Sequence, residues 1–248
     1  MMTSFFENLF MYLARVAPGL VLGAVLLFLV RREPRARIVL YLAMFILLRD
    51  SMTPLGLWSF GAQGFFWIRL HDDPLFLVVF GIACLGLTVA MYFLDHENQP
   101  LVQWMRGKWD RGLLFGVIGA LAVVAPLVVI YRYTPIQTRG GGVSPHLLPA
   151  IFVFALLGNL LEEILFRGYL YGQLVQTRAP LSAAVASGIV FAFCHIYLAT
   201  TVSGVGYPLL AFTLWEGVIA GIVGSKAGVL PATLTHGGAI FLLSSGLI

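Results

Sequence analysis

The 248 residues of this chain are 60% hydrophobic and only 10% charged, whereas a soluble domain carries about 25% charged residues. This composition excludes a sizeable soluble domain and leaves room for about eight apolar helices of about 20 residues each. The net charge of +4 does not indicate nucleic-acid binding, because most basic residues lie in short loops between apolar runs. We therefore expect a single integral membrane domain, residues 1–248, with an all-α fold.

Eight apolar segments follow one another along the chain. The expected spans are about residues 9–30, 38–57, 75–94, 113–130, 147–173, 181–200 and 207–223, and a last one from 229 to the C-terminus. Arg49 and Asp50 interrupt the second span. They could pair with each other or cap a short span at the membrane interface, and we interpret either arrangement as structural. Cys84 and Cys194 lie within apolar segments, so we expect free thiols that contribute to packing.

The loops predict an orientation. Taken together, the loops after the first, third, fifth and seventh spans hold more lysine and arginine than those after the second, fourth and sixth, and the densest basic run is residues 31–37. Because basic loops stay on the cytoplasmic side, we expect both termini to lie outside. The lipid bilayer is the expected environment, and no nucleic-acid partner is expected.

The fifth expected span carries Glu162, Glu163 and Arg167 inside an otherwise apolar run. An ionised carboxylate at the middle of a bilayer costs about 3 kcal/mol on insertion scales, and such residues usually mark functional sites. On a helix, Glu163 and Arg167 are i,i+4 neighbours that can pair, whereas Glu162 points about 100° away. One carboxylate could thus be held by the arginine while the other faces a cavity. The alternative is an ion-pair cluster that only locks helix packing.

Three more ionisable residues, His195, Glu216 and His236, occur in the last three spans. At 1.5 Å per residue, Glu162, His195 and His236 lie roughly 16, 21 and 12 Å from the inner ends of their helices. This convergence predicts an intramembrane polar cavity, although each histidine alone could be a satisfied core residue. Glu216 could pair with either histidine. A helix-packing ridge is predicted by glycines three or four residues apart: Gly217, Gly221, Gly224 and Gly228.

A carboxylate with two imidazoles can activate water. Glu162 can take a proton from water, and the histidines can orient that water, stabilise an oxyanion or bind a zinc-like ion together with the glutamate. Spacing alone does not separate these alternatives. The sequence contains no Gly-x-Ser-x-Gly elbow and no His-Glu-x-x-His motif. It also lacks a phosphate-binding glycine loop, which argues against an ATP-driven pump.

Three motifs, taken in order, resemble those of the CPBP family of intramembrane proteases, the CAAX protease and bacteriocin-processing enzymes, also called the Abi family. They are Glu162-Glu163-x-x-x-Arg167, Phe191-x-x-x-His195 and a glycine-rich span that leads to His236. The resemblance covers about residues 147–248, which would form the catalytic core helices. It implies a bundle of about eight helices with a cavity reached from the cytoplasmic side, in the bacterial inner membrane.

The resemblance also implies an activity: hydrolysis of a peptide bond in a membrane-associated peptide or protein. One example is removal of the C-terminal tripeptide from prenylated proteins. It implies that Glu162 is the catalytic glutamate, that Glu163 and Arg167 support it, and that His195 and His236 complete the site. Phe191, Glu216 and Asn159 are candidate supporting residues. A divalent ion such as zinc, held by His195, His236 and Glu162, is the expected cofactor if a metal is used.

One position departs from the family pattern. Family members commonly carry asparagine four residues after the last histidine, and this chain has Ile240 there. The missing amide would weaken oxyanion stabilisation unless Glu216 or Asn159 takes its place. Two alternatives to a protease therefore stay open. One is a non-catalytic bacteriocin-immunity or scaffold protein of the same fold, and the other is a proton-coupled transporter that uses the buried acids and histidines as a relay.

Overall fold

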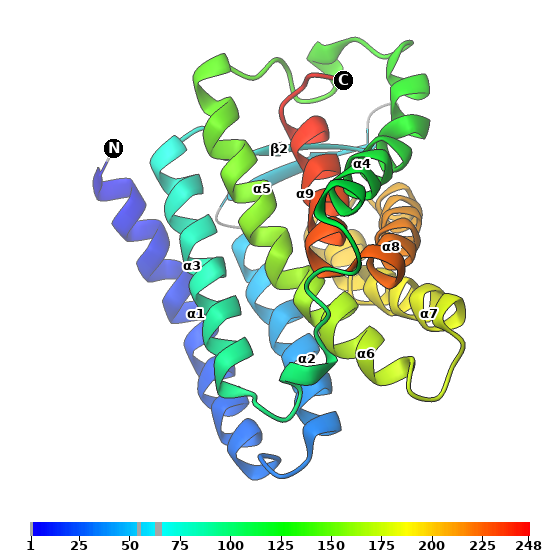
Figure 1. The fold of residues 1–248 in the computed structure, drawn as a ribbon. Coiled ribbons are helices and arrows are strands. Elements are labelled where there is room, and N and C mark those ends of the chain that lie inside the picture. The colour runs from blue at the N-terminus through cyan, green and yellow to red at the C-terminus, as the bar shows by residue number, and fades with distance from the viewer. Residues whose placement is uncertain (1, 54–55, 63–65) are drawn as a thin grey trace.

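The protein is described here by a computed structural model covering residues 2–53, 56–62 and 66–248. Helices form a bundle, and a two-stranded hairpin lies near the end that also holds the C-terminus (Figure 1). The helices are α1 (Met2–Leu29), α2 (Pro34–Met52), α3 (Pro74–Leu94), α4 (Trp109–Tyr131), α5 (Leu148–Glu163), α6 (Tyr171–Leu174), α7 (Pro180–Phe193), α8 (Tyr207–Ala227) and α9 (Val229–Ser244). The remaining elements are strands β1 (Trp58–Gly61) and β2 (Trp67–Leu70), 3-10 turns η2 (Gln99–Leu101), η3 (Ile136–Thr138) and η4 (Pro145–Leu147), and π-helical segments η5 (Ile164–Leu170) and η6 (Leu198–Val202).

The prediction of a mostly helical integral membrane protein is confirmed, but the count of about eight spans is not. All eight expected segments contain a helix, and six helices in the described part of the chain are long and apolar enough to cross a membrane. The expected second span, α2, carries several charged residues, among them Arg49 and Asp50. The expected eighth span, α9, is apolar but only 16 residues long. At 1.5 Å per residue it is about 24 Å long, less than the hydrocarbon core.

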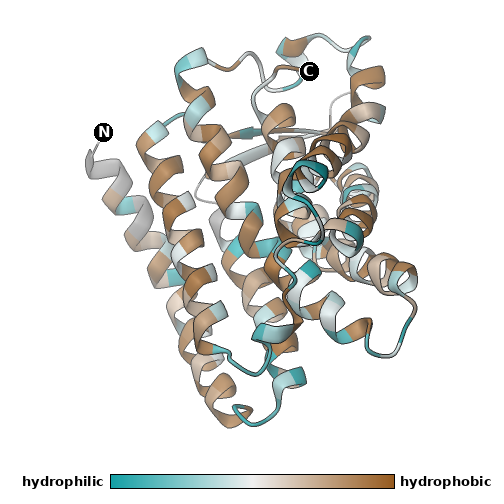
Figure 2. Cartoon of the chain, in the orientation of Figure 1, coloured by the Kyte–Doolittle hydropathy of each residue, from teal (hydrophilic) through white to brown (hydrophobic). Residues whose placement is uncertain are grey.

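Helices α5 and α9 lie at the centre of the bundle. Helix α5 packs against α3 and α9, and α9 also contacts α4 and α8. Helix α7 packs on the far side of α8, while α1 lies at the edge of the bundle beside α2 (Figure 1). Helices α1, α3 and α4 expose many large apolar residues, and the ribbons of α3 and α4 are largely coloured as hydrophobic in Figure 2. Such surfaces are expected where a protein contacts lipid tails.

Glycines allow helices α7, α8 and their neighbours to approach one another closely. A Cβ built on Gly221 of α8 would lie 2.6 Å from the carbonyl oxygen of Ala184 on α7, and one on Gly217 would lie 2.8 Å from the Gly188 oxygen. Gly224 faces the side chain of Arg167, and Gly228 joins α8 to α9 with a φ of +104°. The predicted glycine ridge therefore does pack helices together.

The hairpin corrects the expected second span, which was predicted to continue to about residue 57. Helix α2 ends at Met52, and β1 pairs with β2 in antiparallel register, with Trp58 opposite Leu70 and Phe60 opposite Ile68. Residues 54 and 55, within that expected span, lie outside the described residues. Other helices hold the hairpin in place, since Arg69 donates from Nη1 to the Leu243 oxygen at 2.7 Å and the Tyr131 hydroxyl donates to the Phe66 oxygen.

Candidate functional site

The two adjacent glutamates close helix α5, and the helix then widens into the π-helical segment η5. Such π segments are rare and often occur at functional sites. Ser187 of α7 donates to the Phe166 oxygen at 2.7 Å and so fixes η5 against α7. As the sequence predicted, the widened helix still brings Glu163 and Arg167 together across one turn.

Glu163 is fully buried, and its Oε1 atom accepts two hydrogen bonds. Nη1 of Arg167 lies 2.8 Å from this oxygen, and Nδ1 of His236 lies 2.8 Å from it as well. The other end of the guanidinium is also held, because Nη2 of Arg167 donates to the Gly217 oxygen at 2.8 Å. Glu163 therefore joins α5, η5 and α9 through Oε1, while its Oε2 atom is buried and has no hydrogen-bond partner among the described residues.

His236 lies between two carboxylates. Its Nδ1 faces Glu163, and its Nε2 lies 3.5 Å from Oε2 of Glu216. Ionised carboxylates only accept hydrogen bonds, so an imidazole between two of them donates from both nitrogens, which is the pattern of the imidazolium form. The sequence left open which histidine Glu216 pairs with, and the structure pairs it with His236.

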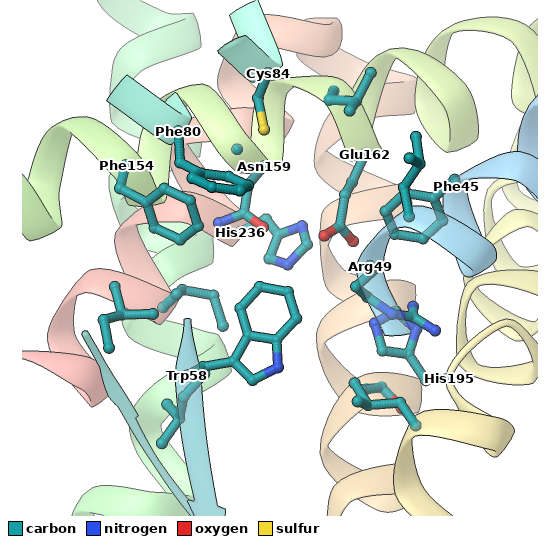
Figure 3. Close-up of a pocket in the computed structure, with 18 of the residues that line it drawn as sticks. Phe45, Arg49, Trp58, Phe80, Cys84, Phe154, Asn159, Glu162, His195 and His236 are labelled. Carbon is teal, nitrogen blue, oxygen red and sulfur yellow. The ribbon is translucent and has the colours of Figure 1, made fainter. Parts of the chain in front are cut away.

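Glu162 lies in a different environment. Its side chain is half-buried and lines a cavity of about 350 Å³. Neither carboxylate oxygen has a hydrogen-bond partner among the described residues, and Oε2 is shielded from solvent. Figure 3 shows the carboxylate directed into the space between His236 and Arg49. The two adjacent glutamates are thus separated as the helix geometry predicted, with one bound in place and one free.

His195 presents one free nitrogen to the same cavity. It lies at a break between α7 and η6, and its Nδ1 is 2.8 Å from the Phe191 oxygen. A carbonyl oxygen only accepts, so Nδ1 carries the hydrogen and Nε2 of the neutral ring keeps its lone pair. The Phe191 ring contacts both histidines, with centroids 4.4 Å from His195 and 5.3 Å from His236. Its supporting role stays a prediction.

The rest of the cavity wall is mostly apolar and lies toward the hairpin. Helices α2 and α8 line it from the halves nearest to β1 and β2, whereas α5 lines it mostly from its C-terminal half, down to Glu162. Strand residues form part of the wall, and Trp58 points into the space (Figure 3). The apolar lining is made by Phe45, Trp58, Phe60, Phe66, Phe80, Phe154, Phe212, Ile240 and further aliphatic residues.

Arg49 is a cavity residue that the sequence interpretation had treated as structural. It does pair with Asp50, at 2.7 Å between Nε and Oδ1. It also lines the cavity with Glu162 and His195, and its Nη2 donates to the Cys194 oxygen at 2.6 Å. The sequence signal was present, because a buried arginine within an apolar span is as unusual as a buried glutamate.

The supporting residues differ in how they are held. Asn159 lines the cavity and donates from Nδ2 to the Ala155 oxygen at 2.6 Å. Ile240 lines the cavity as well and supplies no donor there.

Among the described residues no three His, Cys, Asp or Glu side chains are grouped to hold a metal ion. Both ring nitrogens of His236 face carboxylates, so a metal site at Glu162, His195 and His236 stays a prediction.

The fold and this arrangement of charges define an integral membrane protein with an ionisable site buried among its C-terminal helices. Residues 144–242 match the family model described as type II CAAX prenyl endopeptidase Rce1-like. The resemblance to the CPBP family is therefore confirmed for this part of the chain, and that family generally comprises intramembrane proteases.

Comparison with curated proteins finds a more distant relative. The chain is 22% identical over 155 residues to the UPF0177 protein YxdF of Lactococcus lactis subsp. lactis, a stretch covering 60% of this chain and 82% of that protein. No solved structure matches the chain.

Proposed function

We propose that the protein is an intramembrane endopeptidase of the CAAX-protease type, in which Glu162 activates the attacking water. One observation carries this proposal. Of two adjacent glutamates, Glu163 is bound by Arg167 and His236, while Glu162 faces the cavity without a partner. A buried carboxylate without a partner is costly, and a water molecule that it polarises would satisfy it.

The proposed reaction uses two groups of the cavity that have no partner, the Glu162 carboxylate and Nε2 of His195. A water bound between Glu162 and Nε2 of His195 loses a proton to the carboxylate as its oxygen attacks the carbonyl carbon of the peptide. The carbonyl electrons move onto the oxygen and give a tetrahedral oxyanion. The carbon–nitrogen bond then breaks, the carbonyl re-forms, and the proton on Glu162 passes to the leaving amine. Glu163 acts by holding His236 and Arg167, so its role is positioning.

A divalent ion such as zinc remains part of the proposal. Glu162 and Nε2 of His195 are free to ligate it, while His236 would have to release one of its carboxylates. Such an ion would supply Lewis acidity to water or to a carbonyl. Metal analysis of the purified protein beside a His195→Ala/His236→Ala variant tests this point. Stoichiometric zinc lost in the variant would support a metal site, and equal content in both would contradict one at these residues.

The substrate proposed is a membrane-associated peptide or protein. The apolar cavity wall matches apolar side chains or a lipid group, and prenylation is one option. The membrane proposed is the bacterial inner membrane. The family resemblance implies access from the cytoplasm, whereas the cavity lies in the hairpin half of the molecule, away from the basic loop at residues 31–37. Labelling of single cysteines from the two sides of the membrane tests the side of access.

Cleavage in proteoliposomes tests the activity. Two quenched fluorescent peptides would be used, a farnesylated peptide ending in a CAAX sequence and an unmodified apolar helical peptide. Cleavage of either by the wild type and not by Glu162→Gln, with equal thermal stability, would support the protease. Cleavage that survives Glu162→Gln would contradict the assigned site. A wild type that cleaves neither would favour a non-catalytic member of the fold, and peptide or proton movement that follows a pH gradient would favour a transporter.

A further inference from the structure

Arg49 is fixed rigidly at the wall of the cavity. Its Nε donates to Oδ1 of Asp50 at 2.7 Å, and its Nη2 donates to the Cys194 oxygen at 2.6 Å. The guanidinium also lies over the Phe45 ring, with Cζ 4.9 Å from the centroid. The residue is only 3% exposed. Few mobile degrees of freedom remain, so this cation is preorganised before any ligand arrives.

One donor of this guanidinium is unused. Nη1 is shielded from solvent and has no hydrogen-bond partner among the described residues. A buried donor without an acceptor is destabilising, and a charged one more so. Arg49 interacts electrostatically with both Glu162 and His195. Its ion pair, however, is with Asp50, and no ion pair within 4 Å joins Glu162 to a cation in the described part of the chain.

The other polar groups of the cavity have little to donate. The Tyr12 hydroxyl, the Trp58 indole and the Thr213 hydroxyl each donate to another group of the protein. His236 is engaged on both sides, and the free nitrogen of His195 is an acceptor. Among the described residues, the donors left at the cavity are Nη1 of Arg49, the second hydrogens of Arg49 Nη2 and Asn159 Nδ2, and the weakly donating Cys84 thiol. Nη1 of Arg49 is the charged nitrogen of this set that has no partner at all.

We infer that Arg49 is the oxyanion-binding residue of this site, with Nη1 donating to the carbonyl oxygen of the scissile peptide. The inference rests on the proposed function. As the water oxygen bonds to the carbonyl carbon, the negative charge that forms on the carbonyl oxygen faces a fixed cation in a water-poor cavity. When the carbon–nitrogen bond breaks, that charge returns to the carbonyl. A fixed donor stabilises the charged intermediate more than the neutral substrate, which is the requirement for catalysis.

The hydrogen bonds of Arg49 favour binding of a single substrate oxygen, such as that of a carbonyl group, over binding of a substrate carboxylate. Arginine binds carboxylates best in a bidentate manner, through two neighbouring nitrogens. Here Nε donates to Asp50 and one hydrogen of Nη2 goes to the Cys194 oxygen, so Nη1 is the one nitrogen of this guanidinium without a partner. A carbonyl oxygen needs one donor. Recognition of a free C-terminal carboxylate is accordingly the alternative that the test must separate.

The first measurement is steady-state cleavage of the peptide that the wild type cleaves, prepared with a free and with an amidated C-terminus. Arg49→Met should lower kcat about 10²-fold or more with little change in KM, as for loss of other oxyanion donors, and equally for both peptides. Arg49→Lys should recover part of the rate. Asn159→Ala, which removes a neutral amide donor from the cavity, should change kcat less than tenfold. A rise in KM limited to the free carboxylate would overturn the inference.

The second measurement does not depend on turnover. A phosphinic peptide carries a tetrahedral anion at the scissile position, and the matching hydroxyethylene peptide is tetrahedral and neutral. Wild type should bind the phosphinic peptide more tightly, and Arg49→Met should reduce this preference at least tenfold while hydroxyethylene binding stays unchanged. Should Arg49→Met fail to fold because Asp50 is left unpaired, the Arg49→Met/Asp50→Leu variant replaces it. Equal loss for both ligands, or loss for neither, would overturn the inference.

The two measurements also distinguish this inference from the proposed function. A wild type that cleaves no peptide but keeps an Arg49-dependent preference for the phosphinic ligand would support the anion site and contradict the protease. Cleavage that is insensitive to Arg49 would support the protease and overturn the anion site. Neither cleavage nor binding of either ligand would overturn both.

Discussion

Glu163 on α5 lies 2.8 Å from Nδ1 of His236 on α9, although the two residues are 73 positions apart in the chain. This contact, together with Arg167, holds Oε1 of Glu163 in place, whereas the adjacent Glu162 faces the cavity without any hydrogen-bond partner among the described residues. The two glutamates are adjacent and have the same side chain, but they differ in what they touch. Their substitution should therefore have different consequences for stability and similar ones for activity.

Glu162→Gln should abolish cleavage and leave stability unchanged, since no hydrogen bond or ion pair among the described residues is lost. Glu163→Gln should also impair cleavage, but it should lower the free energy of unfolding by about 3 kcal/mol or more, because Arg167 stays buried without its counter-charge. Thermal unfolding in detergent, measured beside peptide cleavage, checks both. Equal stability of the two variants would contradict the proposed division of roles.

Arg167→Met should destabilise the protein, because it removes one of the two groups that hold the buried Glu163 and a hydrogen bond to the Gly217 oxygen. The expected loss is about 3 kcal/mol. The double variant Glu163→Gln/Arg167→Met should be more stable than the sum of the single changes predicts, since it leaves no uncompensated charge. Purely additive losses would show that the pair is not coupled. Arg178→Met, at an exposed loop position, is the matched control and should be neutral.

Much of the candidate site could be predicted from the sequence, because helix geometry is local. The 3.6-residue period separates Glu162 from Glu163 and brings Glu163 to Arg167, and both relations are found. The depth estimate brought Glu162, His195 and His236 toward one level, and these residues line one cavity. The partner of each histidine could not be predicted, since it depends on the rotation of α8 and α9 about their axes.

The parts that sequence reasoning missed depend on contacts between distant segments. The hairpin of β1 and β2 is short, and its alternation of Trp58, Ser59 and Phe60 is a strand signal that was hidden at the end of an apolar run. Arg49 looked like a local pair with Asp50, and that pair is real. Its place at the cavity follows only from the break of α7 at His195, where the Cys194 oxygen becomes its acceptor.

The orientation predicted from basic loops can be tested with cysteine labelling. In a Cys84→Ser/Cys194→Ser background, Arg32→Cys and Ser59→Cys place single exposed thiols in the α1–α2 loop and on the hairpin. A membrane-impermeant maleimide added to intact cells should label Ser59→Cys and leave Arg32→Cys unlabelled until the membrane is opened. This result would place the hairpin, and the part of the cavity that it lines, on the outer side of the membrane. The reverse pattern would place the hairpin, and the cavity with it, toward the cytoplasm, as the family resemblance implies.

The contact between α7 and α8 should control activity through the position of His195. A Cβ on Gly188 would lie 2.7 Å from the backbone of Gly217 and Val218, so Gly188→Ala must push the two helices apart. Overpacking of this kind costs about 1–3 kcal/mol. Because Arg167 donates to the Gly217 oxygen and His195 follows the end of α7, cleavage should fall as well. Gly86→Ala on α3 meets no atom within 4 Å and is the matched control. Full activity in Gly188→Ala with a lowered melting temperature would show that the site tolerates movement of α7, and the rigid placement of His195 would then be wrong.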